Sequence, residues 1–269
     1  EANKTLETWR SVVEGMLDLG VDRKTPVFAL GGGVTGDIAA FAAASTLRGL
    51  SVVQVPTTLL SMVDSSVGGK TGVNTRHGKN LVGAFHQPAL VHIAIETLDT
   101  LTDAELRCGL GEVVKHAVIA DPGFFEWLEQ NAPALVSRDH DALRHVVLRC
   151  CAIKAEVVSA DEREAGRRAV LNLGHTIGHA LEATLGYGAL RHGEAVGIGM
   201  LAEARLAVAR GEAESALPDR IEGLLDRLGL PIAWPDADPE ALLDATKMDK
   251  KRARGRITVT IPRRIGEVR

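Results

Sequence analysis

The sequence has 269 residues, of which 45% are hydrophobic and 25% charged, an ordinary balance for a globular protein. This length suggests two domains or one large domain. The formal net charge of −4 argues against a nucleic-acid-binding protein, because such proteins usually carry a strong excess of basic residues.

Hydrophobic residues at helical spacing predict a first helix over residues 5–19, which ends at Gly20. The chain starts at Glu1 without a methionine and ends at Arg269 in an expected turn, so we expect a trimmed or partial chain. After Pro26, the short apolar run VFAL predicts a buried parallel strand.

A glycine-rich turn, GGGVTG at 31–36, lies between this strand and a predicted helix at 34–46. The pattern G-x-G-x-x-G in this position suits a dinucleotide phosphate, because glycine admits the pyrophosphate and the helix N-terminus donates N–H groups. The acidic residue usually found about 20 positions later is missing, since that region reads SVVQVPTT. The simpler alternative is a tight strand-to-helix turn.

A second buried strand is predicted over 51–56, and another over 90–95. Between them we expect a long loop rich in Gly, Ser, Thr and Asn, of a kind that is usually functional or disordered. Its charged and polar side chains would suit phosphate or carboxylate contacts, although a solvated loop would have the same composition. They are Asp64, Lys70, Lys79 and Asn80.

From Thr100 onward, helical periods dominate. Thr102 and Glu105 form an expected capping box for a helix on which Glu112, Lys115 and His116 share one face. Such a group is most often a surface ion pair, but the neighbouring glycine and valines are poor surface composition. Further helices are predicted at 141–164 and after residue 194, and a strand at 256–262.

The segment 167–194 carries His175 and His179 four residues apart on one helical face, followed by His192 and Glu194. Imidazoles from different elements are a typical start to a catalytic zinc site, which needs one more ligand and an open position. The alternative is two core histidines and a surface histidine. The surrounding glycines and the pair Arg167-Arg168 favour the metal site.

The three cysteines Cys108, Cys150 and Cys151 form no C-x-x-C pair and indicate buried thiols in a reducing compartment. No apolar run reaches membrane-spanning length without a charge, and no signal peptide is recognisable. We therefore expect a cytoplasmic protein.

Over essentially its whole length, the chain resembles the 3-dehydroquinate synthase family. The blocks that carry the resemblance are GGGVTGD, VPTTLLSMVDSSVGGKTGVN, GKNLVGAFHQP, GEVVKHA, LNLGHTIGHALE, RHGEAVGIGM and MDKK. The resemblance implies an α/β, Rossmann-like NAD-binding domain at 1–99, lacking its first strands, and an all-α metal- and substrate-binding domain at 100–269. The active site would lie in the cleft between them, and the family resemblance also implies a homodimer.

The resemblance also implies site residues. The metal, Zn²⁺ or Co²⁺, would be bound by Glu112, His175 and His192. Substrate contacts would be Arg48, Asp64, Lys70, Lys79, Asn80, Lys115, Lys154, Arg168, Asn172, His179 and Lys250. NAD contacts would be Glu1, Lys4, Gly32, Gly33, Asp37, Thr57, Thr58, Asp64, Lys70 and Lys79.

The implied reaction converts 3-deoxy-D-arabino-heptulosonate 7-phosphate to 3-dehydroquinate, by transient oxidation, phosphate elimination, re-reduction, ring opening and aldol closure. Sister sugar phosphate cyclases, such as 2-epi-5-epi-valiolone or 2-deoxy-scyllo-inosose synthases, are the nearest alternative. Asn172, His179 and the run at 249–251 favour the dehydroquinate enzyme. A metal-dependent polyol dehydrogenase would not need the phosphate-binding lysines, so these lysines argue against that class. A non-enzymatic regulator would require that the truncation of the chain is natural.

Overall fold

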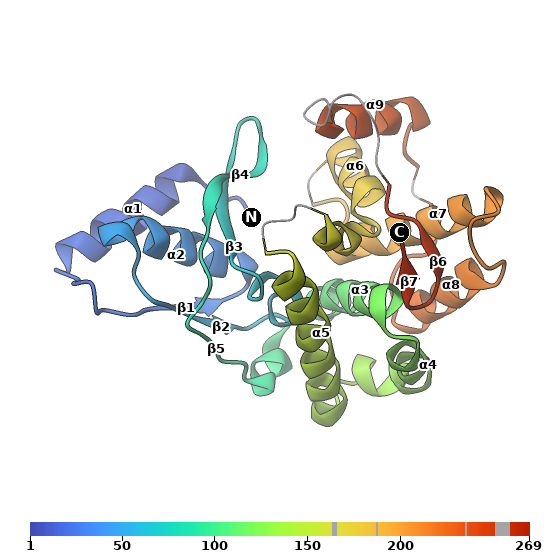
Figure 1. Ribbon diagram of the computed structural model, residues 1–269, viewed down its shortest axis with the longest axis horizontal. Helices are drawn as coiled ribbons and strands as arrows, with labels where there is room; N and C mark the ends of the chain where they lie inside the picture. The colour runs from blue at the N-terminus through green and yellow to red at the C-terminus, as the bar shows by residue number, and fades with distance from the viewer. Residues whose placement is uncertain (163–165, 187, 235, 251–258) are drawn as a thin grey trace. The chain divides into compact units, whose positions relative to one another are not determined.

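The structure is a computed structural model that describes residues 1–162, 166–186, 188–234, 236–250 and 259–269, without the side chains of 247–250. The chain divides into two compact units, Glu1–Leu101 and Thr102–Arg269 (Figure 1). In the described part of the chain, no helix combines the length and apolar character needed to cross a membrane.

The first unit is an α/β unit built on a small parallel sheet. Its helices and strands are α1 (Leu6–Asp18), β1 (Val27–Gly31), α2 (Gly33–Ser45), a 3₁₀ turn (Thr46–Arg48), β2 (Val52–Pro56), a π-helical turn (Ser61–Ser65), β3 (Lys70–Thr75), β4 (Gly78–Phe85), β5 (Leu90–Val91) and a 3₁₀ helix (Ile95–Thr100). The sheet has the order β1-β2-β5, and α2 packs against β1 and β2. The predicted strand at 90–95 is shorter than expected, because regular pairing stops after Leu90–Val91 and a 3₁₀ helix begins at Ile95.

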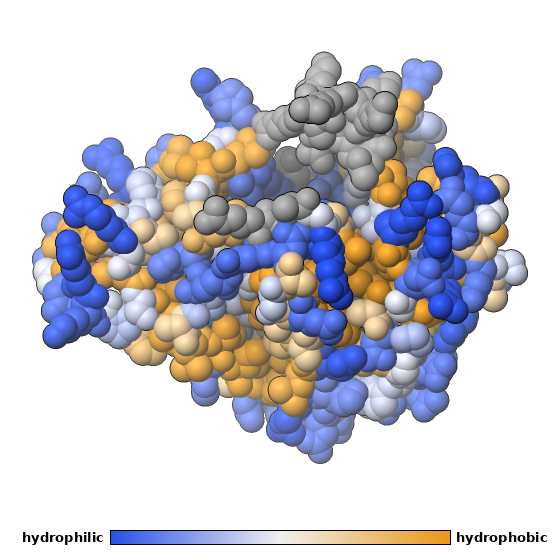
Figure 2. Space-filling model, in the orientation of Figure 1, coloured by the Kyte–Doolittle hydropathy of each residue, from blue (hydrophilic) through white to orange (hydrophobic). Residues whose placement is uncertain are grey.

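Small side chains bring α2 close to the sheet. Ala29 on β1 and Ala40 and Ala43 on α2 form a buried cluster with Leu50 and Val52. The opposite face of β1 is different, because Phe28 and Leu30 alternate with Ala29 and are 65% and 66% exposed. The prediction of a parallel strand is confirmed, but the prediction that VFAL is buried is wrong for this face. In Figure 2, hydrophobic surface is visible around the position that β5 has in Figure 1.

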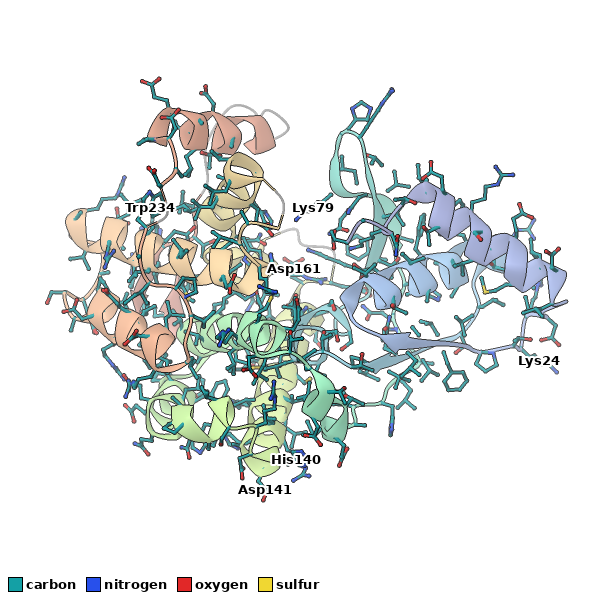
Figure 3. The ribbon with its side chains drawn as sticks, turned by 180° about the vertical axis from the view of Figure 1, so that it is seen from behind. Lys24, Lys79, His140, Asp141, Asp161 and Trp234 are labelled. Carbon is teal, nitrogen blue, oxygen red and sulfur yellow. The ribbon has the colours of Figure 1, made fainter. Side chains whose placement is uncertain are left out.

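The segment expected as a long loop contains regular structure. Strands β3 and β4 form an antiparallel hairpin, with Gly72 paired to Gly83. A Cβ atom on Gly83 would lie 1.9 Å from the Thr71 carbonyl oxygen, so only glycine fits at this point. Lys79 lies on β4 of this hairpin (Figure 3). The loop prediction was wrong because glycine and asparagine have low strand propensity, so the composition hid the pairing.

Among its described residues, the second unit is helical apart from a two-stranded hairpin. Its elements are α3 (Asp103–Ala120), α4 (Pro122–Val136), α5 (His140–Ala160), a 3₁₀ helix (Arg167–Asn172), α6 (His175–Leu185), α7 (His192–Ala209), α8 (Leu217–Arg227), α9 (Pro239–Lys250), β6 (Pro262–Arg264) and β7 (Glu267–Val268). The Thr102 cap is confirmed, since its side chain accepts a hydrogen bond from the Glu105 N–H at 3.3 Å. Of the strand expected at 256–262, residues 256–258 lie outside the described residues, and the described part enters a strand only at Pro262, where β6 begins.

Together the two units confirm the predicted fold class. An α/β unit with a parallel sheet precedes a unit whose core is helical. Within the second unit, helix α7 packs against both α3 and α6.

Candidate metal centre and cofactor segment

Three helices of the second unit bring one potential metal ligand each to a common point. Glu112 lies on α3, while His175 and His192 are the first residues of α6 and α7. One ligand atom from each lies within 4.8 Å of the other two. The Glu112 Oε1 atom lies 3.7 Å from His175 Nε2 and 3.5 Å from His192 Nε2. Tetrahedral ligands at metal bonds of about 2.1 Å are separated by about 3.4 Å, so this arrangement fits a zinc-sized ion.

The carboxylate of Glu112 is held charged in the interior. Glu112 has no exposed surface, and its Oε2 atom forms an ion pair with Lys115 one turn later on the same helix. Burial alone would raise the pKa of Glu112, but Lys115 and the two imidazoles hold it well below its usual range. Its Oε1 atom is buried without an assigned hydrogen-bond donor among the described residues. A charged, buried oxygen facing two imidazole nitrogens is a suitable ligand for a divalent cation.

The two imidazoles differ in what surrounds them. Burial lowers the pKa of His175 to about 3, aided by the charge of Lys115, so its ring is neutral. Burial would also lower the pKa of His192, but Glu112 and Glu182 together raise it to about 9. The Nδ1 atom of His192 lies 3.8 Å from Glu182 Oε1, on the side of the ring opposite Glu112. Because a metal needs the neutral ring, binding at His192 would displace a proton.

Backbone contacts at glycine hold the ligand-bearing helices together. A Cβ atom on Gly193, next to His192, would lie 1.8 Å from the Cys108 carbonyl oxygen on α3. A Cβ atom on Gly111, next to Glu112, would lie 2.3 Å from the Gly193 carbonyl oxygen. The Gly193 N–H also donates to Cys108 Sγ at 3.3 Å, and burial raises the pKa of this thiol to about 11. The candidate ligands Glu112 and His192 therefore lie close together because the backbones of α3 and α7 are in contact beside them.

The structure places His179 beside His175, as the helical spacing predicts, and gives Glu194 a capping role. The ring of His179 stands 5.3 Å from that of His175 and 5.9 Å from that of His192, so all three imidazoles are neighbours. Glu194 instead caps α7, because its Oε2 atom accepts a hydrogen bond from the Arg191 N–H at 2.8 Å. The second unit therefore brings His179 beside the candidate metal ligands, and Glu194 caps the start of α7.

Three basic side chains predicted to contact substrate are buried in this unit. Lys115, Lys154 and Arg168 are 1%, 5% and 2% exposed. The Arg168 Nη1 atom donates to the Glu162 carbonyl oxygen at 2.6 Å. Its backbone N–H donates to Asp161, which lies at the end of α5 (Figure 3). Buried cations are costly without anionic neighbours or ligands.

The remaining predicted contacts of this unit are Asn172, which is exposed, and Lys250, which falls outside the described side chains.

In the first unit, the predicted cofactor residues gather around the end of the sheet. The Thr57 N–H donates to the Gly31 carbonyl oxygen at 2.9 Å, which holds the ends of β2 and β1 together. A Cβ atom on Gly32 would lie 3.1 Å from Thr58 Cγ2, and one on Gly33 would lie 2.9 Å from Ser65 Oγ. Helix α2 begins at this turn without a side-chain cap. An uncapped helix N-terminus made of glycine at the carboxyl edge of a parallel sheet fits a pyrophosphate.

A charged pair lies beside this turn. Lys4 is 5% exposed and forms an ion pair with Asp37 on α2. Burial raises the pKa of Asp37 despite the opposing charge of Lys4, and Asp64 and Glu1 raise it further. Four of the predicted residues are therefore close enough to interact electrostatically.

Asn74 connects the N-terminal segment with the β3–β4 turn. Its backbone N–H donates to the Lys4 carbonyl oxygen, and its side-chain amide donates to Glu1 Oε1, each at 2.8 Å. Its Oδ1 atom accepts from the Asn80 N–H at 3.0 Å, where Asn80 has a φ of +55°. The other predicted residues of this unit are Arg48, which is exposed with a φ of +70°, exposed Lys70 and half-buried Lys79.

Sequence reasoning missed Glu182, Glu203 and Asn74. Glu182 and Glu203 are 6% and 0% exposed, although each stands in a predicted helix. Their signal was a lone carboxylate among apolar residues, as in AVGIGMLAEA around Glu203. Asn74 gave no signal because its partners Glu1 and Lys4 are distant in the sequence.

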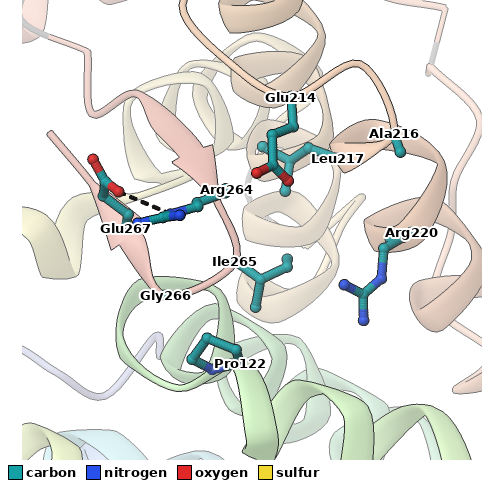
Figure 4. Close-up of a pocket in the computed structure, with 9 residues that line it drawn as sticks. All are labelled: Pro122, Glu214, Ala216, Leu217, Arg220, Arg264, Ile265, Gly266 and Glu267. Atoms are coloured by element: carbon teal, nitrogen blue, oxygen red, sulfur yellow. Dashed lines mark hydrogen bonds and ion pairs between the residues drawn. The ribbon is translucent and has the colours of Figure 1, made fainter.

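A separate cavity of about 390 Å³ lies beside the β6–β7 hairpin (Figure 4). Arg264 and Glu267 at its wall are paired at 2.9 Å. Among the described residues that line it, none is a predicted site residue, so this cavity is separate from the metal centre.

Comparison with known proteins agrees with this arrangement. A family model described as 3-dehydroquinate synthase N-terminal matches residues 1–108, and one described as 3-dehydroquinate synthase C-terminal matches residues 109–252. A 3-dehydroquinate synthase of Rhodopirellula baltica is 50% identical over 269 residues, which is 100% of this chain and 72% of the relative. One of Nitrosomonas europaea is 49% identical over 99% of this chain and 72% of its own length.

Two solved structures are similar throughout. A 2-epi-5-epi-valiolone synthase from Streptomyces hygroscopicus, with NAD⁺ and Zn²⁺ bound, has a TM-score of 0.92 and 34% identity, over 100% of this chain and 75% of its own. A 2-deoxy-scyllo-inosose synthase with carbaglucose-6-phosphate, NAD⁺ and Co²⁺ has a TM-score of 0.92 and 29% identity, also over 100% of this chain and 75% of its own. The two family models and the relatives at about half identity show that the chain belongs to the 3-dehydroquinate synthase family.

Proposed function

We propose that this chain converts 3-deoxy-D-arabino-heptulosonate 7-phosphate to 3-dehydroquinate and phosphate, using NAD and a divalent metal ion. The observation that carries the proposal is the convergence of Glu112, His175 and His192 at coordination spacing. It occurs in the unit that the family's C-terminal model matches. This step belongs to the shikimate pathway of aromatic amino acid biosynthesis, and the enzyme is a carbon–oxygen lyase.

The metal centre would polarise a hydroxyl group of the substrate. Glu112, His175 and His192 supply three ligands, which leaves an open position for a substrate oxygen. Zn²⁺ suits two imidazoles and one carboxylate, and Co²⁺ has similar preferences. Lys115 keeps Glu112 ionised, so this ligand has no proton to lose when the ion binds, whereas His192 has to release one.

Basic and polar side chains would bind the anionic groups of the substrate. Lys115, Lys154 and Arg168 are buried cations, to which a phosphate or carboxylate could add charge-assisted hydrogen bonds. His179 lies beside the two ligand imidazoles and is exposed, so it is placed to move a proton near the reacting carbon. Arg48, Asp64, Lys70, Lys79, Asn80, Asn172 and Lys250 complete the proposed substrate set.

The first unit would bind NAD, which when bound accepts a hydride from the substrate and later returns it. Gly32 and Gly33 admit the pyrophosphate at the start of α2, and Thr57 and Thr58 follow the neighbouring strand. Glu1, Lys4 and Asp37 form a network beside this turn, together with Asp64. Lys70 and Lys79, on the β3–β4 hairpin, complete the proposed NAD contacts.

A different sugar phosphate cyclase is the second candidate, because two such enzymes share this fold at a TM-score of 0.92. Their identities of 34% and 29% are lower than the 50% and 49% found with the 3-dehydroquinate synthases. A probable glycerol dehydrogenase from Sinorhizobium meliloti, at 15% identity and a TM-score of 0.66, shares only the fold. Sequence identity therefore favours the dehydroquinate reaction.

The proposed function predicts phosphate release without net NADH formation. Protein given the heptulosonate phosphate and a catalytic amount of NAD should release one phosphate per substrate consumed, while absorbance at the NADH wavelength stays level. The reason is that the hydride is returned to the substrate within each turnover. Steady accumulation of one NADH per substrate would instead identify a dehydrogenase. Turnover of a cyclase substrate in preference to the heptulosonate would support the second candidate.

The buried cations give a second prediction. Lys154→Ala and Arg168→Ala should each raise the substrate KM by roughly 10- to 100-fold, the usual cost of losing a hydrogen bond to a charged group. Arg144→Ala is the matched control, because Arg144 lies on the same helix as Lys154 and forms an ion pair with Asp141 at the surface. A wild-type KM in either variant would remove that residue from the substrate site.

A homodimer in the cytoplasm remains a proposal based on the family. The three cysteines are free thiols, which suits a reducing compartment.

A further inference from the structure

One peptide group connects a buried carboxylate with a proposed metal ligand. The His175 Nδ1 atom lies 3.1 Å from the Leu173 carbonyl oxygen. A carbonyl oxygen can only accept, so Nδ1 carries the proton and donates, and the lone pair on Nε2 faces Glu112. The N–H of Gly174, on the other side of the same peptide group, donates to Glu203 Oε2 at 2.6 Å. Glu203, on α7, has no exposed surface.

This peptide group is also held in place by packing. Gly174 has a φ of +77°, which favours glycine, and a Cβ atom there would lie 2.4 Å from the Val196 carbonyl oxygen. A Cβ atom on Gly199 would lie 2.1 Å from the Gly174 carbonyl oxygen. The start of α6 is therefore pressed against α7, close to the helix turn that carries Glu203. The short hydrogen bond that the Gly174 N–H donates to Glu203 sets the orientation of a peptide group that has little room to rotate.

We propose that Glu203 is a positioning residue for His175, acting through the Leu173–Gly174 peptide group. The carboxylate polarises this peptide group, which makes the Leu173 carbonyl oxygen a stronger acceptor for the Nδ1 proton. That bond fixes the tautomer and the ring plane of His175, so that Nε2 presents its lone pair to the ion. Metal-binding histidines usually have a carboxylate or carbonyl partner on the second nitrogen, and here the two are connected in series.

The burial of Glu203 supports a role of this kind. A fully buried carboxylate is costly unless its oxygens are hydrogen-bonded or paired, so specific partners have to hold it in place. The Gly174 N–H is one such partner, and it belongs to the peptide group that precedes His175. The inference rests on the proposed function, because it assumes that His175 is a metal ligand.

The test uses Co²⁺ binding to the metal-free full chain, followed by the visible absorption of the ion and by competition with a chelator. Glu203→Met removes the acceptor and should weaken Co²⁺ binding by about 10- to 100-fold and change the visible band. Glu203→Gln keeps an oxygen that can accept from Gly174 and should lose less than about 10-fold. Far-ultraviolet circular dichroism and NAD binding should be unchanged in both.

Leu201→Ala is the matched control, because Leu201 is 2% exposed on the same helix and its loss leaves a packing defect. It should lower the melting temperature while Co²⁺ affinity stays at the wild-type value. Wild-type affinity and spectrum in Glu203→Met would overturn the inference, as would an equal loss of affinity in Leu201→Ala. If the wild-type protein itself fails to bind Co²⁺, the proposed metal site is wrong. If the wild-type protein binds Co²⁺ and Glu203→Met binds it equally well, only the proposed role of Glu203 is wrong. The two failures are therefore distinguishable.

Discussion

Replacing His175 with alanine should remove the divalent ion and lower kcat by about a thousand-fold, which corresponds to about 4 kcal/mol of transition-state stabilisation. The variant keeps Glu112 and His192, but two ligands hold an ion far more weakly than three. The fold should survive, because Lys115 continues to neutralise the buried Glu112 carboxylate. Metal content by atomic emission and kcat at saturating substrate would be measured on the same preparation.

His145→Ala is the matched control for this prediction. His145 lies on α5 and its ring stacks against Trp127 at 4.2 Å, away from the ligand cluster. Its removal should leave both metal content and kcat at wild-type values. If His175→Ala retained one ion per chain, His175 would not be a ligand and the proposed centre would be wrong.

Gly193→Ala should have the largest effect on folding of any single methyl group added near the site. The new Cβ atom would lie 1.8 Å from the Cys108 carbonyl oxygen, a backbone atom that cannot turn away. Helices α3 and α7 would have to separate, which moves Glu112 away from His192. We expect a loss of roughly 3 kcal/mol or more in the free energy of unfolding, at the upper end of overpacking effects, together with loss of the metal.

The matching control is Gly223→Ala on α8. An added Cβ atom at Gly223 meets nothing within 4 Å, so alanine should stabilise the helix by about 0.5–1 kcal/mol. Chemical denaturation of both variants with and without added Zn²⁺ would measure the difference. A Gly193→Ala protein with wild-type stability and metal content would show that the two helices need not touch.

Much of the local structure could be predicted from the sequence. The glycine turn after β1 gave the position of α2, and Thr102 with Glu105 gave the first turn of α3. Both signals are local, because capping and turn chemistry depend on residues a few positions apart. The hairpin of β3 and β4 could not be predicted in this way, since its close approach depends on the pairing of Gly72 with Gly83.

The proposed metal centre shows more clearly what local sequence patterns cannot predict. Helical spacing drew attention to His175 and His179, but the structure brings His175 together with His192 and Glu112. Glu112 lies 63 positions before His175 (175 − 112), and no local pattern indicates that their helices meet. Only the family resemblance selected this set. The supporting carboxylate of Glu203 was missed altogether, because its effect passes through a peptide group that belongs to another element.

The contacts between α3 and α7 also affect how this centre could be redesigned for another metal. They are made by backbone atoms at Gly111 and Gly193, so the distance between the two helices does not depend on the ligand side chains themselves. A designer could exchange Glu112 or His192 for a different donor and keep the helices where they are. The preference for an ion could thus be altered one ligand at a time, whereas the two glycines would have to be kept.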